Sequence, residues 1–164
     1  MALKSLDDLF VHELSDIYNA EKQLTKALPR LARAASNPKL SQIFESHLQE
    51  TTGQVERIDQ LVDKLQLRIK RVKCHAMEGL IEEGREVIDE IAQGPVLDAA
   101  LIASAQKVEH YEIASYGTLC ALASQLGHKD AIKLLKATLD EEKAADRKLT
   151  ELAESDQNAK AKDA

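Results

Sequence analysis

Apolar residues recur along this chain at alternating steps of three and four, which is the spacing of one face of an α-helix. The pattern runs through four long segments and predicts helices over about residues 5–35, 38–67, 95–126 and 129–154. Pro38 and Pro95 stand at helix starts, where proline is favoured, and Gly127 follows the third segment, where glycine commonly ends a helix. The sequence therefore predicts an all-α domain built on a four-helix bundle.

The segment between the second and third helices, residues 68–94, has a different character. It begins with the basic run RIKRVK and continues with apolar residues set among acidic ones from His75 to Ala92. We expect a long crossover that carries one or two short helices and lets the third helix run parallel to the second. Residues 1–154 would form one domain, and the polar residues 155–164 would be a frayed tail.

Carboxylates interrupt the apolar stripes of three helices. Glu21 interrupts the first stripe, Glu112 the third, and Glu142 together with Asp146 the last. Each occupies a position where the helical period predicts a buried apolar side chain. A buried carboxylate is costly unless a partner compensates it, and a metal ion is one such partner.

The stripe of the second helix is polar at its centre, where His47 and Gln54 lie between apolar positions and Glu50 lies on the flank. His47 shares a face with Glu50, so it is either a metal ligand or a histidine at the edge of the core. Glu109 precedes Glu112 by one helical turn and lies near the same face.

The interrupting carboxylates also lie at matching heights. Glu21 and Glu50 are each about four turns from the turn that joins their helices, and Glu112 and Glu142 are each about four turns from Gly127. Any one of them alone would be explained as a solvated helix charge, but matching heights on paired helices favour one site. The predicted metal residues are Glu21, Glu50, Glu112 and Glu142, with Glu109, Gln54 and Asp146 as additional ligands or hydrogen-bonding neighbours.

A weak internal repeat, offset by about 91 residues, leaves one assignment open. It aligns Glu21 with Glu112 but Glu50 with Glu141, whereas the apolar stripe of the last helix favours Glu142. Hard oxygen donors suit iron or manganese, and bundles with inward carboxylates on four helices commonly hold two such ions. We therefore expect two iron or manganese ions.

Composition narrows the function classes. The net charge of −6 argues against nucleic acid as a partner. The N-terminal residues show no signal-peptide pattern and no apolar run is long enough for a membrane span, so we expect a cytoplasmic protein without a membrane partner. Cys74 and Cys120 lack the spacing of a metal pair, which indicates reduced thiols.

Five sequence blocks resemble a known family over about residues 3–153. They are DIYNAEKQLTKAL, HLQETTGQVERID, KCHAMEGLIEEG, AQKVEHYEIASYGTL and TLDEEKAADRKLTELA, which together are similar to the YciF-type, ferritin-like bacterial stress proteins. The resemblance implies a four-helix bundle with extra helices in the crossover, a homodimer, induction under stress, and no settled biochemical activity.

The wider ferritin-like pattern carries one Glu on each of two helices and Glu-x-x-His on the other two. Glu21 and Glu112 match the lone positions, and Glu50 and Glu142 match the first members of the pairs. The histidine positions hold Gly53 and Ala145 instead, and Gln54 and Asp146 are candidate replacements.

Three functions are compatible with these residues. The first is a non-haem di-metal carboxylate protein that meets a small oxidant, peroxide or oxygen, in stress defence. The second is a non-enzymatic, dimeric protein that binds a partner through the acidic crossover helix and keeps a vestigial metal site. The third, ferritin-like iron storage, requires a closed shell of many subunits.

Overall fold

The computed structural model describes residues 3–164, and within that range every regular element is a helix. The elements are α1 (Leu6–Ala34), α2 (Pro38–Leu65), α3 (His75–Glu90), α4 (Pro95–Gln125), α5 (Lys129–Leu152), a π-helical turn (Ala153–Gln157) and α6 (Asn158–Lys162).

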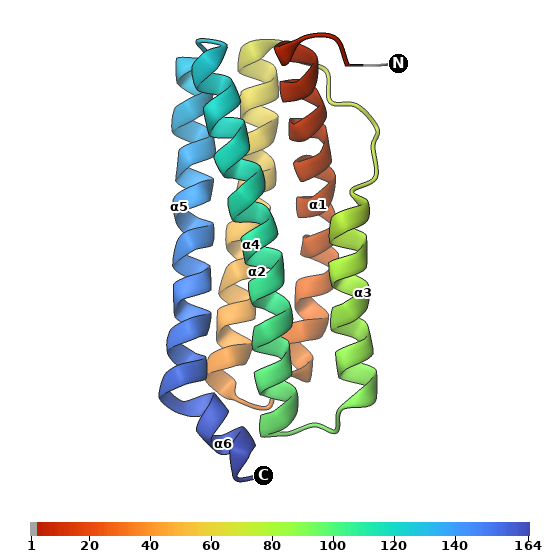
Figure 1. Ribbon diagram of the computed structural model, residues 1–164, viewed down its shortest axis with the longest axis vertical. Coiled ribbons are helices and arrows are strands. Elements are labelled where there is room, and N and C mark those ends of the chain that lie inside the picture. Colours follow the sequence, from red (N-terminus) through yellow and green to blue (C-terminus); the bar gives the residue numbers. More distant parts are fainter. Residues whose placement is uncertain (1–2) are drawn as a thin grey trace.

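The four long helices form a bundle of two antiparallel hairpins, α1–α2 and α4–α5 (Figure 1). α1 packs chiefly against α2 and α4 against α5, and the contacts of α2 with α5 and of α1 with α4 close the bundle. The crossover returns the chain to the end where α2 begins, so α2 and α4 run parallel. The predicted all-α bundle with a long crossover is thus confirmed, and the crossover carries a single helix, α3.

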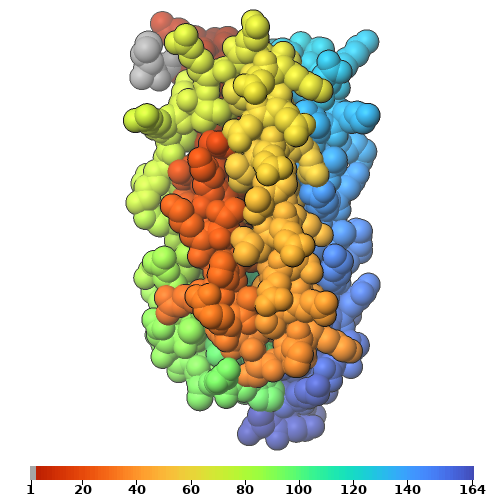
Figure 2. Space-filling view, turned by 180° about the vertical axis from the view of Figure 1, so that it is seen from behind, coloured from red at the N-terminus to blue at the C-terminus, as the bar shows by residue number. Residues whose placement is uncertain are grey.

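Helix α3 covers the seam between α1 and α4, and polar contacts fix the extended chain that leads into it. The Lys70 backbone N–H donates to Ser15 Oγ at 3.0 Å, and the Cys74 N–H donates to Asn19 Oδ1 at 2.8 Å. Figure 2 shows α1 lying between α2 and α3 on the rear face. The basic run is therefore held along α1 by its third residue and by the residue that follows it.

The C-terminal residues differ from the frayed tail expected of their polar composition. They form the π-helical turn and α6, and Gln157 is buried. Asn37 Nδ2 donates to Gln157 Oε1 at 2.9 Å, and Gln157 Nε2 donates to the carbonyl oxygen of Pro95 at 3.1 Å. These contacts join the tail to the α1–α2 turn and to the start of α4, which explains its order.

The core is apolar at both ends of the bundle and polar in the middle. Helix α1 shows this most simply, because buried Glu21 stands between buried Ile17 and Leu24. None of the helices formed by residues 3–164 has the length and apolar character needed to cross a membrane. The largest fully buried apolar and aromatic side chains include Phe10, Leu14, Leu40, Phe44, Leu61, Met77, Leu101, Tyr116 and Leu119.

Buried Asp98 connects the two hairpins, and we expect its loss to be costly. Its two carboxylate oxygens accept the backbone N–H groups of Ser36 at 2.7 Å and Asn37 at 2.9 Å. Asp98→Ala would leave both donors without a partner, so we expect the free energy of unfolding to fall by about 2–4 kcal/mol in urea denaturation. Asp130→Ala, in the exposed first turn of α5, is the matched control and should change little; equal effects would contradict this role.

Candidate metal centre

Four glutamates from three helices point into the middle of the bundle. Glu21 of α1, Glu112 of α4 and Glu142 of α5 are fully buried, and Glu109 of α4 is 2% exposed. Each stands in a row of buried residues at helical spacing, so the backbone of its helix directs the carboxylate inward. The long helices thereby collect four potential negative charges in a region closed to solvent.

His47 of α2 joins these carboxylates from the fourth side of the bundle. Its Nε2 atom lies 3.2 Å from Glu109 Oε1 and 3.6 Å from Glu142 Oε2. Its Nδ1 atom lies 3.3 Å from Glu50 Oε2, which faces outward. Ligand atoms of His47, Glu109, Glu112 and Glu142 all fall within 4.8 Å of one another, so one cation could contact all four side chains.

The polar atoms of this cluster are buried and poorly satisfied. Glu112 and Glu142 each have two buried oxygens without a hydrogen-bond partner. Buried polar atoms are normally paired, so unpaired atoms in such number need an explanation. One imidazole nitrogen with several carboxylate oxygens is a donor set that fits iron or manganese. Three more buried atoms of the cluster also lack a hydrogen-bond partner: Glu21 Oε2, His47 Nε2 and Glu109 Oε2.

Burial and mutual repulsion favour the protonated forms of Glu21, Glu109 and Glu112 when no cation is bound. Loss of solvation, reinforced by the charge of Glu142, raises the pKa of Glu21 to about 8. The same two causes raise the pKa of Glu112 well above its ordinary value, and burial with the neighbouring Glu142 does so for Glu109. A cation would reverse this effect by favouring the ionised forms.

For the His47 imidazole, nearby carboxylates outweigh the effect of burial on the pKa. Burial acts to lower its pKa, but the hydrogen bond to Glu50 and the charge of Glu142 outweigh burial and raise the pKa. The same hydrogen bond lowers the pKa of Glu50. His47 therefore links an outer, ionised carboxylate to the inner cluster.

Tyr116 supports the cluster from one turn beyond Glu112. Its buried hydroxyl donates a hydrogen bond to Glu21 Oε1, which holds that carboxyl in one orientation. Burial and the charge of Glu21 raise the pKa of Tyr116 well above its ordinary value, so the phenol keeps its proton. It acts on Glu21 as a fixed donor.

The structure brings together only part of the predicted ligand set. Glu21, Glu109, Glu112 and Glu142 meet at the centre, whereas Glu50 is half-buried and reaches the cluster through His47. Asp146 lies toward the surface, where Gln106 Nε2 donates to its Oδ1 at 3.1 Å and His110 Nε2 is 3.3 Å from the same oxygen.

Gln54 and Glu141 belong to a separate arrangement beside the cluster. Gln54 is buried, and its Nε2 donates to Glu141 Oε2 at 3.0 Å. Arg57 donates to both oxygens of Glu141, at 2.9 and 2.8 Å. Between the two candidates on the last helix, the structure therefore turns Glu142 inward and gives Glu141 an arginine partner.

Ser115 and Asp146 were expected on the buried faces of their helices but lie outside them. The reason is that the line of buried residues shifts slightly around each helix relative to the spacing assumed from the sequence. Along α4 the buried row passes from Glu112 to Tyr116 and Leu119, not through Ser115, and along α5 it passes from Glu142 to Ala145, which leaves Asp146 off the core. The metal residues predicted from the sequence did not include His47. Its position in the stripe of α2, between apolar residues, indicated that it faces inward.

A groove of about 390 Å³ between α2 and α5 leads from solvent to the cluster. His47 and Glu50 line it, and Lys39, Lys148 and Glu151 are the other charged residues along it. Lys148 Nζ lies 3.8 Å from Glu50 Oε1. The groove gives a hydrophilic ion a path to the histidine that faces the buried carboxylates.

The same architecture occurs in known proteins. A family model described as a domain of unknown function, DUF892, matches residues 5–162. The chain is 64% identical to protein YciF of Escherichia coli (strain K12) over 162 residues, 98% of each chain. The crystal structure of the E. coli stress protein YciF covers 92% of this chain and 96% of its own, with a TM-score of 0.90 and 66% identity.

A second solved structure shows the same arrangement in another bacterium. YcfI of Rhodopseudomonas palustris, described as a candidate structural protein, superimposes with a TM-score of 0.87 at 52% identity. The alignment covers 90% of this chain and 94% of that chain. Sequence and structure agree over nearly the full length, and the chain therefore belongs to the YciF-type stress-protein family defined by the DUF892 domain.

Proposed function

We propose that this protein is a ferritin-like, non-haem metal carboxylate protein of stress defence that holds two iron or manganese ions at the centre of its bundle. One observation carries the proposal: four buried side chains converge to within 4.8 Å, and most of their inward atoms lack a hydrogen-bond partner. The stress proteins to which the chain is similar support the physiological setting. An apolar core would not collect unpaired carboxylates without a compensating cation.

The residues divide into two overlapping groups. His47, Glu109, Glu112 and Glu142 would hold one ion, and Glu21 with the remaining oxygens of Glu112 and Glu142 would hold the second. When bound, the ions would supply redox and Lewis-acid chemistry toward a small oxidant such as peroxide or oxygen.

The chain itself supplies the environment of the site. The surrounding apolar core excludes water, Tyr116 orients Glu21 and keeps its own proton, and the groove at Glu50 admits hydrophilic species from solvent. Binding of the ions would release the protons that burial keeps on Glu21, Glu109 and Glu112.

Metal content per chain tests the proposal. The protein is treated with chelator, loaded anaerobically with Fe(II) or Mn(II), desalted and measured by elemental analysis. We expect about two ions per chain in a di-metal site of this kind. Glu112→Ala should abolish retention, because both ion positions share that carboxylate.

Glu141→Ala is the matched control, one residue from a central ligand on the same helix and paired with Arg57. It should retain metal at the unmodified level. Unchanged metal in Glu112→Ala, or equal loss in both variants, would refute the assignment of the ligands.

A second candidate is a non-enzymatic, homodimeric scaffold whose carboxyls remain neutral. It is favoured by the structural role assigned to the R. palustris relative and by the raised pKa values of Glu21, Glu109 and Glu112. It predicts no retained metal together with a stable, partner-binding dimer. Size-exclusion chromatography separates a dimer from the closed shell that ferritin-like storage would require.

A further inference from the structure

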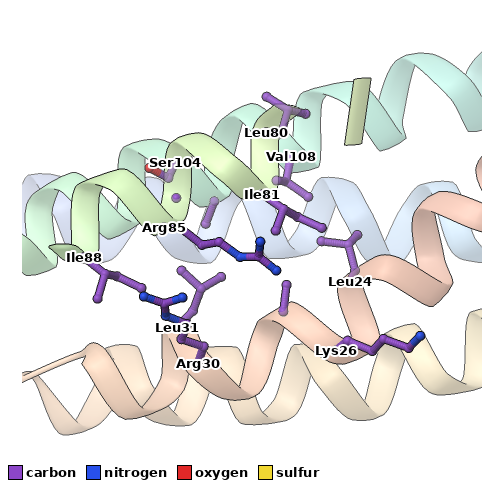
Figure 3. Close-up of a pocket in the computed structure, with 13 residues that line it drawn as sticks. Leu24, Lys26, Arg30, Leu31, Leu80, Ile81, Arg85, Ile88, Ser104 and Val108 are labelled. Atoms are coloured by element: carbon purple, nitrogen blue, oxygen red, sulfur yellow. The ribbon is translucent and has the colours of Figure 1, made fainter. Parts of the chain in front are cut away.

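A pocket of about 100 Å³ opens between α1, α3 and α4, outside the metal centre (Figure 3). Its walls are mostly apolar, and the side chains that form them come from all three helices. These walls include Leu24 and Leu31 of α1, Leu80, Ile81 and Ile88 of α3, and Val108 of α4. An enclosed apolar cavity of about 150 Å³ binds benzene; this pocket is smaller but opens to solvent, so part of a short alkyl chain can enter it from the rim.

Gly84 of α3 keeps this pocket open. Glycine is less favourable than alanine inside a helix, so a buried example needs a reason. Close helix packing is not the reason, because a Cβ atom at Gly84 would meet nothing within 4 Å. Gly84 is buried and lines the pocket, and the absent side chain leaves space there.

The charged residues that line the pocket are all cations. They are Lys26 and Arg30 of α1 and Arg85 of α3, and Figure 3 shows the two guanidinium groups beside the apolar walls. Their carboxylate partners, Asp89 for Arg30 at 2.7 Å and Glu82 for Arg85 at 3.2 Å, do not line the pocket. A locally cationic rim on a chain of net charge −6 favours an anionic group at this place.

The ion pairs on the rim do not block such a ligand. Arg30 and Asp89 are 43% and 67% exposed, and Arg85 and Glu82 are 54% and 60% exposed. Exposed ion pairs contribute little to stability and exchange readily with other partners. Lys26 forms no ion pair within 4.0 Å with any carboxylate of the described residues, so it can meet a ligand directly.

We propose that this pocket binds a small organic anion with an apolar body, such as a carboxylate carrying a chain of about four to six carbons. The apolar chain would lie between Leu31, Ile88 and Val108, and the carboxylate would meet Arg85, Arg30 or Lys26 at the rim. The site is separate from the metal centre, so it does not depend on the proposed metal function.

The test uses full-length, metal-free protein, so that a carboxylate cannot bind through a metal ion. Hexanoate, hexan-1-ol and hexylammonium are each titrated and followed by amide NMR shifts. We expect saturable shifts with hexanoate at α3 and the facing residues of α1 and α4. Hexan-1-ol should bind about tenfold more weakly and hexylammonium should not bind, because charged hydrogen bonds to the rim are lost or opposed.

Two pairs of variants locate the site. Gly84→Leu fills the pocket and should abolish hexanoate binding, whereas Gly79→Leu, at the exposed glycine of the same helix, should not. Arg85→Met should weaken hexanoate about three- to tenfold without affecting hexan-1-ol. Arg33→Met removes an exposed charge of α1 that does not line the pocket and should change neither ligand.

Three results would overturn the proposal. One is the absence of saturable hexanoate binding at millimolar concentration in the unmodified protein. Another is hexanoate affinity that survives both Gly84→Leu and Arg85→Met. The third is equal binding of hexanoate and hexan-1-ol, because the cationic rim would then contribute nothing.

Discussion

Glu112→Leu is expected to make the metal-free protein more stable while it removes metal binding. Glu112 is fully buried, and apart from the neighbouring carboxyl of Glu21 no group of the described residues is placed to hydrogen-bond its oxygens. Replacing an unsatisfied buried polar group by an apolar one of similar size removes its desolvation penalty. The penalty of leaving a buried polar group unsatisfied is about 1–3 kcal/mol, and we expect a gain in this range.

The gain is measured by urea denaturation of chelator-treated protein at neutral pH, with Glu45→Leu as the control. Glu45 is an exposed residue of α2, so its replacement matches the change in helix propensity without altering the core. If Glu112→Leu instead lowers the free energy of unfolding of the metal-free protein, the carboxyl is satisfied in the native state and the argument for a compensating cation fails.

The metal-free protein is expected to lose stability as the pH rises from about 5 to 8. A carboxyl whose pKa is raised on folding stabilises the native state fully below its unfolded pKa, and this contribution is lost as the pH rises through the folded value. The pKa of Glu21 rises on folding from its ordinary 4.5 to about 8, and the pKa of Glu109 and Glu112 is raised as well. The summed loss is on the order of a few kcal/mol.

His47 adds to the change in the same direction, because its pKa is also raised, so its stabilising contribution is lost as the pH rises through the folded value. Metal should reverse the slope, since deprotonated ligands bind cations more tightly as the pH rises. Thermal unfolding from pH 5 to 8, with and without Mn(II), measures both trends. Glu112→Leu should flatten the metal-free curve, whereas metal-free stability that increases with pH would contradict the raised pKa values.

The sequence was sufficient to predict the helical bundle, because its signals are local. They are the helical spacing of apolar residues, the prolines at two helix starts and the glycine after the third long helix. It also indicated that Glu21, Glu112 and Glu142 face inward, since each replaces an apolar residue in an otherwise regular stripe. The choice of Glu142 over Glu141 followed from the same reasoning about burial. The internal repeat favoured Glu141 instead, because similarity between two segments does not indicate which helix face is buried.

Other features depend on contacts between distant segments that periodicity cannot supply. The position of Glu50 was compatible with a ligand, but α2 turns it toward the groove and Lys148. Asp146 lies outside the core because the buried face of α5 contains Ala145 instead. The order of the tail rests on the contact of Gln157 with Asn37, which are 120 residues apart.

His47 is the most instructive case. Its position in the stripe of α2 placed it inward, but the sequence left open whether it was a ligand or a residue at the edge of the core. Only the three-dimensional arrangement places Nε2 near Glu109 and Glu142 while Nδ1 faces Glu50. The ferritin-like pattern puts a histidine three residues after the glutamate, whereas here the histidine stands three residues before Glu50.

The most direct measurement of the central claim is anomalous X-ray scattering from crystals of the protein loaded with Mn(II) or Fe(II). Two anomalous peaks are predicted in the middle of the bundle, one between His47, Glu109, Glu112 and Glu142 and the other beside Glu21. Crystals of Glu112→Ala should show neither peak. Loaded crystals with no peak at these side chains, or with peaks at exposed carboxylates alone, would contradict the proposed metal centre.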